Sequence, residues 1–171
     1  MPVQRQSRGG ATSSTVRRPG LLATTPCRLL TRIAAVAWSD GRMGKDEAEG
    51  LLRAAREAGV DASGLAEIEK ATTTRIELAS VGTDDLLPFD AALTYALASW
   101  LARLDGVVKP EEHASLMALA KLCGLDPKVR DTAAAAAFDV AMLKSGDRPA
   151  KYDFGALIER LKVRLPSLAK T

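Results

Sequence analysis

Apolar residues from position 26 onward recur at the three- and four-residue spacing of helices, and no segment alternates as a half-buried strand does. In the first helix, for example, Leu29, Leu30, Ile33 and Val36 fall on one face. Glycine, proline and aspartate mark the ends of the apolar stretches. The predicted helices cover 27–38, 45–58, 87–104, 110–123, 127–143 and 154–165, with two short helices between 63 and 81 joined at Thr72–Thr74. The helix over 87–104 should bury one broad apolar stripe. We therefore predict an all-α protein, a compact bundle of about seven helices.

The chain also repeats one unit. Asp40-Gly41 is followed by Asp46-Glu47 and by a helix that stops at Gly59, and the same residue types recur at Asp105-Gly106, Glu111-Glu112 and Gly124. Asp105 lies 65 positions after Asp40, and Gly124 lies 65 positions after Gly59. Self-similarity at a fixed offset is typical of a duplicated supersecondary unit. We therefore predict two units, each a helix, an Asp-Gly loop and a helix, and expect any acidic site to lie where they meet.

Length and composition are those of one ordinary globular domain. The chain has 171 residues, of which 47% are hydrophobic and 26% charged, which is enough to bury a core without disulfides. Its apolar stretches are shorter than the roughly 18 residues that a membrane-spanning helix needs. Cys27 and Cys123 are too few for a disulfide framework and are predicted to pack as reduced thiols. These features favour a cytoplasmic protein and leave peripheral contact with the inner membrane open.

Charge is distributed unevenly along the chain. Six arginines and no acidic residue precede Asp40, whereas the remainder has 18 basic against 21 acidic residues. Residues 1–26 are also rich in Ser, Thr, Gly and Pro without helical periodicity, which predicts a flexible, disordered basic arm before a helical domain over 27–171. An export signal is disfavoured, because the apolar stretch after Arg17-Arg18 is too short.

The arm is interpreted either as a solvated tail or as a docking segment. In the second case its arginines would contact an acidic protein, anionic lipid or nucleic acid. No aromatic residue is interleaved with them, which argues against nucleic acid. We therefore expect a protein partner and keep a membrane surface as the alternative. The arginines concerned are Arg5, Arg8, Arg17 and Arg18.

The two acidic loops together resemble the pattern of a known protein family. They read Ser39-Asp40-Gly41-Arg42-Met43-Gly44-Lys45-Asp46-Glu47 and Leu104-Asp105-Gly106-Val107-Val108-Lys109-Pro110-Glu111-Glu112. This duplicated pattern resembles the TerB (tellurite-resistance protein B) superfamily over about residues 29–143. The second loop is the closer match, because the family favours a β-branched residue after the Asp-Gly and a proline before the acid pair. The first loop has Arg42, Met43 and Gly44 instead.

The resemblance implies an all-helical bundle of about seven helices in which a pseudo-twofold axis relates the two units. It also implies a non-catalytic module linked to tellurite resistance and to wider chemical-stress or membrane-associated defence. The candidate metal site that it implies would be formed by Asp40 and Glu47 from the first copy and by Asp105 and Glu112 from the second, with Asp46 and Glu111 as neighbours.

The chemistry of these acids fits two interpretations. Four carboxylates brought together would suit a hard cation such as Ca²⁺, Mg²⁺ or Mn²⁺. Alternatively each acid is structural, because Asp before Gly is common turn chemistry and acids in a first helical turn complement the helix dipole. The spacing lacks the alternating ligands of an EF-hand loop. The residues alone leave both interpretations open.

The remaining residues nominate no catalytic site. There is one histidine, His113, which we predict to be packed or half-exposed, and neither a P-loop nor a Gly-x-Ser-x-Gly elbow is present. We therefore expect no enzyme and identify no small-molecule substrate. Trp38 and Trp100 are predicted to anchor the two units in one core, and the methionines to fill gaps there. Alanines 133–137 should let another helix approach closely.

Overall fold

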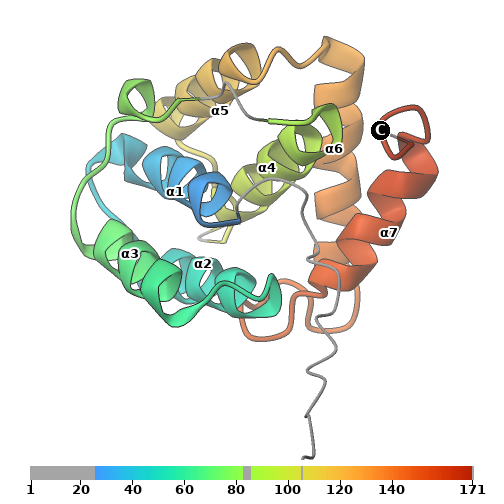
Figure 1. The fold of residues 1–171 in the computed structure, drawn as a ribbon. Helices are drawn as coiled ribbons and strands as arrows, with labels where there is room; N and C mark the ends of the chain where they lie inside the picture. The colour runs from blue at the N-terminus through green and yellow to red at the C-terminus, as the bar shows by residue number, and fades with distance from the viewer. Residues whose placement is uncertain (1–25, 83–85, 105, 171) are drawn as a thin grey trace, which may run out of the picture.

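The computed structural model describes residues 26–82, 86–104 and 106–170 (Figure 1). These residues form seven α-helices and two short 3₁₀ helices without any β-strand, which confirms the predicted all-α class. The predicted arm lies outside the described residues, except for Pro26, which begins α1. No helix within the described ranges is both long and apolar enough to cross a bilayer. The bounds are α1 Pro26–Ala37, η1 Trp38–Asp40, α2 Lys45–Glu57, α3 Ala62–Thr73, η2 Leu78–Ser80, α4 Pro88–Leu101, α5 Pro110–Leu122, α6 Pro127–Ala141 and α7 Phe154–Arg164.

Helix α4 forms the centre of the bundle. Every residue from Asp90 to Leu101 is buried, whereas the sequence predicted a single apolar stripe. α4 contacts α1, α2, α5, α6 and α7, and it packs most extensively against α6. Alanines at positions 91, 92, 96 and 98 permit this, because small side chains let neighbouring helices approach from several sides. A helix that is apolar all round is typical of a position enclosed by protein.

The other helices surround α1 and α4 (Figure 1). α2 and α3 cover one side of α1, α5 lies on the other side, and α6 followed by α7 packs beside α4. Buried side chains from both repeat units join in one hydrophobic cluster, among them Leu29 and Leu51 from the first unit and Leu97 and Leu119 from the second. The two units therefore share a core, as the duplication predicted.

The segment between the two units contains one α-helix and a 3₁₀ turn instead of the two short helices predicted. α3 continues through Thr73, and η2 follows. The hydroxyls of Thr72 and Thr73 donate to the carbonyls of Glu69 and Lys70 at 2.7 and 3.0 Å. Because these bonds satisfy the hydroxyls locally, β-branched residues are accommodated in the last turn of the helix.

The duplication is also visible in the backbone hydrogen bonds that end the second helix of each unit. Gly59 and Gly124 adopt left-handed conformations, with φ of +74° and +61°. The two helix ends form the same pair of bonds, which define a Schellman motif. At the end of α2, the N–H of Gly59 donates to the carbonyl of Arg56 and the N–H of Val60 donates to the carbonyl of Ala55. At the end of α5, Gly124 donates in the same way to Lys121, and Leu125 donates to Ala120. The four distances are 2.9–3.1 Å.

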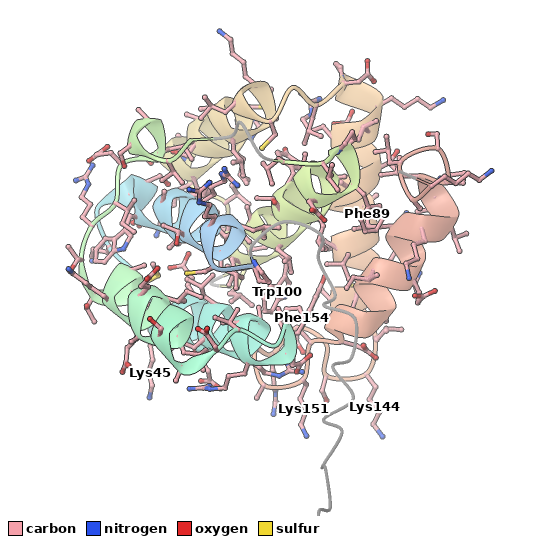
Figure 2. The ribbon with its side chains drawn as sticks, in the orientation of Figure 1. Lys45, Phe89, Trp100, Lys144, Lys151 and Phe154 are labelled. Carbon is pink, nitrogen blue, oxygen red and sulfur yellow. The ribbon has the colours of Figure 1, made fainter. Side chains whose placement is uncertain are left out.

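Three aromatic side chains fasten the C-terminal part of the chain to α4. The indole of Trp100 stacks on Tyr152, with ring centroids 4.0 Å apart, and meets Phe154 edge-on at 5.5 Å. Figure 2 shows Trp100 and Phe154 close together inside the bundle. The buried hydroxyl of Tyr152 donates to the carbonyl of Ala137 in α6 at 3.1 Å. Trp100 thus anchors the core, as predicted.

Two polar side chains connect α1 and η1 to later segments. The indole of Trp38 is only partly buried and donates to the carbonyl of Ala71 in α3 at 2.8 Å. Arg32 belongs by sequence to the basic N-terminal part, yet it is 2% exposed, and its Nε donates to the carbonyl of Gly82 at 2.6 Å. Arg32 therefore fastens α1 to the segment after η2 and is not part of the basic surface of the protein.

Candidate functional site

The two acidic loops meet, and a lysine joins them. Asp40 ends η1 in the first loop, and Lys109 lies in the second loop, directly before α5. The Nζ atom of Lys109 is 2.6 Å from Oδ2 of Asp40 and 3.7 Å from Oε1 of Glu112. The side chains of Asp40 and Glu112 are 9% and 4% exposed, and that of Lys109 is 39% exposed. One ammonium group therefore lies between largely buried carboxylates from both copies of the repeat.

Local backbone geometry holds Asp40 in this position. Gly41 adopts φ of +86°, and its N–H donates to the carbonyl of Trp38 at 2.9 Å. A side chain at that φ would be strained, so glycine suits the reversal of the chain. Oδ1 of Asp40 accepts the backbone N–H of Arg42 at 2.9 Å. One carboxylate oxygen is thus used within the first loop, and the other faces Lys109.

The two predicted glutamates cap their own helices. Oε2 of Glu47 accepts the N–H of Gly44 at 2.7 Å, and Oε2 of Glu112 accepts the N–H of Lys109 at 2.8 Å. Each glutamate is the third residue of its helix, so both bonds correspond to the glutamate half of a capping box. Capping is therefore one role of both residues. In Glu112, Oε2 accepts the capping bond, and the other oxygen, Oε1, faces the ammonium of Lys109.

A groove of about 480 Å³ opens beside the ion pair and is lined by both loops. Three acidic and three basic side chains line it, so its formal charges balance among the described residues. Asp46 and Lys45 are exposed at its rim, and Figure 2 shows Lys45 at the surface of the molecule. The lining side chains are Asp40, Asp46 and Glu47, then Arg42, Lys45 and Lys109, with Met43, Gly44 and Leu104 between them.

The structure brings some of the predicted site residues together and not others. Asp40, Asp46 and Glu47 line the groove, and Glu112 adjoins it through Lys109. Glu111 and His113 are exposed on α5, so the histidine is not packed in the core. Within the ranges that the structure describes, no three His, Cys, Asp or Glu side chains are grouped closely enough to hold a metal ion. Asp105, Arg5, Arg8, Arg17 and Arg18 lie outside the described residues.

Lys109 is the functional residue that the sequence interpretation missed. Its counterpart 65 positions earlier is Gly44, so comparison of the two copies gives it no role. That asymmetry was nevertheless the available signal, because the position three residues before the capping glutamate is a lysine in the second loop and a glycine in the first. The partner of Lys109 lies 69 positions away in the chain, and local spacing does not identify such a contact.

No protein-family model, curated protein or solved structure matches this chain. Function is therefore inferred from the residues of the two loops, and the TerB resemblance stays a prediction from their motif.

Neither cysteine offers a reactive thiol. Burial and the neighbouring Glu67, whose Oε2 lies 3.2 Å from Sγ, raise the pKa of Cys27 to about 11. Burial also raises the pKa of Cys123. Both cysteines are free, and at neutral pH both stay protonated, the form in which a thiol is a poor nucleophile and a poor metal ligand. The carboxylates are therefore the better candidates for site chemistry.

The ion pair with Lys109 makes the contribution of Asp40 to stability depend on pH. The hydrogen bond from its ammonium group holds the pKa of Asp40 below the ordinary value of 3.8, against the opposing effect of burial. The pKa of this carboxyl group is therefore lower in the folded state than in the unfolded state. The resulting stabilisation is present above the unfolded-state pKa and is lost as the pH falls through the folded-state pKa.

We expect Asp40→Asn to lower the free energy of unfolding by about 1 kcal/mol at neutral pH. The difference from the wild type should shrink as the pH falls below 3.8. Urea unfolding of the wild type and of Asp40→Asn at a series of pH values measures this difference. A difference that stays constant from neutral to strongly acidic pH would contradict the ion pair.

Proposed function

We propose that this chain is a non-catalytic, TerB-like binding module that acts in tellurite or other chemical-stress response. The groove between the two acidic loops is proposed as its working site, and a divalent cation, Ca²⁺, Mg²⁺ or Mn²⁺, as its ligand. The resemblance of the two Asp-Gly loops supports the family and the biological setting. The two free cysteines support a cytoplasmic location, and the membrane-associated defence that the resemblance implies supports peripheral contact with the inner membrane.

The ion pair between Lys109 and Asp40 is the observation that carries the proposed ligand. The position 2.6 Å from Oδ2 of Asp40 is occupied by a positive group, and a second carboxylate, Glu112, faces the same group. Both acids are largely buried, so a charge placed between them interacts more strongly than it would in water. Oxygen-only donors of this kind suit hard cations. Asp105, in the same loop as Lys109, is the further carboxylate that the proposal assigns to the site.

Cation binding would compete with the lysine. A divalent ion that takes Oδ2 of Asp40 must displace the Lys109 ammonium, because both need the same oxygen. The side chain of Lys109 is 39% exposed and therefore has room to turn outward. The displaced ammonium would join Arg42 and Lys45, two bases that already line the groove. Cation binding would thus change the charge that the groove presents to a partner.

Thermal unfolding with and without each divalent cation tests the proposal. The full chain, first treated with EDTA, should gain stability in Ca²⁺, Mg²⁺ or Mn²⁺, because a ligand that binds only the folded state stabilises it. At a hundredfold excess over Kd the gain is about 2.7 kcal/mol, or roughly 5–10 °C in Tm. The double variant Asp40→Asn/Asp105→Asn should lose this gain.

A Lys109→Met variant makes the test specific for competition. It keeps the length of the side chain and removes the ammonium, so it should bind the cation more tightly than the wild type does. Glu49→Gln is the matched control, because this exposed acid of α2 does not line the groove, and it should retain the response. The cation proposal is overturned if neither the wild type nor Lys109→Met gains stability in any of the three ions. That outcome would favour the alternative, in which the chain is a scaffold component whose N-terminal arginines dock on an acidic protein or lipid.

A further inference from the structure

Helix α6 has apolar side chains on two faces, and the described residues bury only one of them. The buried face lies in the bundle, where α6 makes its most extensive contact with α4 (Figure 1). On the other face, Phe138 is 50% exposed, and Met142, which directly follows the helix, is 70% exposed. This methionine therefore does not fill a gap in the core as the sequence predicted. We call the second face the α6 stripe; its apolar residues are Ala134, Phe138, Ala141 and Met142.

A hollow of about 200 Å³ lies beside the α6 stripe, between α4 and α6. The two alanines of the stripe and Ala137 form its apolar wall, and Phe138 and Met142 stand at its edge. A cavity of about 150 Å³ accommodates benzene, so the hollow is large enough for one phenylalanine ring. The same surface therefore has both protruding apolar side chains and a recess that can receive one.

Further exposed apolar side chains adjoin the stripe and the hollow. Val107 is 71% exposed and follows Gly106, which lines the hollow. Leu143 is 42% exposed and follows Met142. Single exposed apolar residues are common on protein surfaces, whereas contiguous groups of them mark interaction sites. We therefore expect another protein surface to cover the α6 stripe in solution.

Two exposed side chains of opposite charge flank the hollow and indicate which protein that is. The guanidinium of Arg103 lies 5.9 Å from the centroid of the Phe138 ring, and Asp147 comes from the loop after α6. Neither forms an ion pair with another described residue, so these two charges are not neutralised by each other. In an interface with a twofold axis, residue i of one copy meets residue j of the other, and j meets i. A surface with a protruding ring, a recess, a base and an acid is therefore complementary to a second copy of itself.

We propose that the α6 stripe is the interface of a homodimer with twofold symmetry. Phe138 of each copy enters the hollow of the other copy and packs on its alanines. Arg103 of each copy faces Asp147 of the partner subunit, so the interface has two equivalent ion pairs. A second copy is favoured over a different protein because the stripe, the hollow and both charges lie on one surface, as a symmetric interface requires.

The proposed dimer interface is separate from the acidic groove. Among the lining residues of the hollow and of the groove, only Leu104 is shared. Dimer formation as proposed needs no cation, because apolar packing and ion pairs within the protein hold the two copies together. The dimer is therefore measured in EDTA, where the result does not depend on whether the groove binds a metal ion.

Sedimentation equilibrium of the full chain over a range of concentrations tests the proposal. The mass should rise with concentration from the 18.1 kDa of one chain towards twice that value. Phe138→Ser should raise the dissociation constant of the dimer about thirtyfold, because an apolar side chain at the centre of an interface carries much of its affinity. Leu122→Gln is the matched control. Leu122 is 43% exposed and lines a different surface groove, between α5 and η2, so this variant should dimerise as the wild type does.

Charge reversal tests the twofold arrangement. Arg103→Glu and Asp147→Lys should each weaken the dimer about tenfold, because each variant places like charges opposite one another at two symmetric positions. A mixture of the two variants should form heterodimers in preference to either homodimer, since both contacts then join opposite charges. The double variant Arg103→Glu/Asp147→Lys should recover the affinity of the wild type for the same reason.

Three results would overturn the proposal. The first is a wild-type chain that stays a monomer at every concentration up to the millimolar range. The second is a dimer that Leu122→Gln abolishes and Phe138→Ser does not, which would place the contact at the groove between α5 and η2. The third is a mixture of the two charge-reversed variants that forms no heterodimer, because Arg103 and Asp147 would then not meet across a twofold axis. Thermal unfolding of each variant shows that its fold is retained.

Discussion

Replacing Ala136 by leucine should lower the free energy of unfolding by about 1–3 kcal/mol, whereas the same change at Ala135 should alter it by less than about 0.5 kcal/mol. Ala136 is fully buried, on the helix that packs most extensively against α4, and Ala135, its neighbour, is exposed. Leucine adds three carbon atoms at a position of α6 that is already fully buried. Both changes alter helix propensity equally, so their difference measures packing alone.

Urea unfolding followed by circular dichroism at 222 nm measures both variants. Two-state transitions with equal m-values would show that the variants differ in stability and not in the compactness of the unfolded state. If Ala136→Leu is as well tolerated as Ala135→Leu, the core around Ala136 is packed less tightly than described.

Glu112→Ala is expected to lower the free energy of unfolding by about 1–3 kcal/mol, and Glu111→Ala by less than about 0.5 kcal/mol. Glu112 is 3% exposed, accepts the N–H of Lys109 at 2.8 Å and lies 3.7 Å from the ammonium of the same residue. Its removal leaves the buried N-terminal donor of α5, the N–H of Lys109, without this acceptor and takes one of two carboxylates from the Lys109 ammonium. Glu111 is adjacent and exposed, which makes it the matched control.

Measuring Glu112→Ala and Glu111→Ala in EDTA separates the capping role of Glu112 from its proposed role as a cation ligand. A capping glutamate stabilises the fold without any metal, so the loss should appear in EDTA at full size. If Glu112→Ala has no effect in EDTA and differs from the wild type only when a divalent cation is added, the hydrogen bond to Lys109 contributes nothing to stability. The glutamate would then act as a ligand alone.

Local rules predicted most of the secondary structure. Helix periodicity, the glycine stops at Gly59 and Gly124, and prolines in first turns depend on residues close together in the chain, and the structure retains them. The burial of α4 on all sides could not be predicted in this way, because it depends on five helices from other parts of the sequence. For the same reason Arg32 was grouped with the basic N-terminal part, although it donates to a carbonyl 50 positions away.

The candidate site, too, was predicted where it depends on local sequence and missed where it depends on distant contacts. The repeat identified Asp40, Glu47 and Glu112, and capping chemistry, one of the two interpretations offered, describes how both glutamates bond to their own helices. The pairing of Asp40 with Lys109 depends on how two loops pack against each other, and no spacing rule indicates it.

The difference between Gly44 and Lys109 has a consequence for the duplication itself. The first half supplies the carboxylate at the junction and the second half supplies the ammonium. A chain built from two first halves would have glycine at both positions that correspond to Lys109, and a chain built from two second halves would have lysine at both. The halves have therefore become complementary and are no longer interchangeable, so a substitution in one loop is tolerated or rejected according to what the other loop contains.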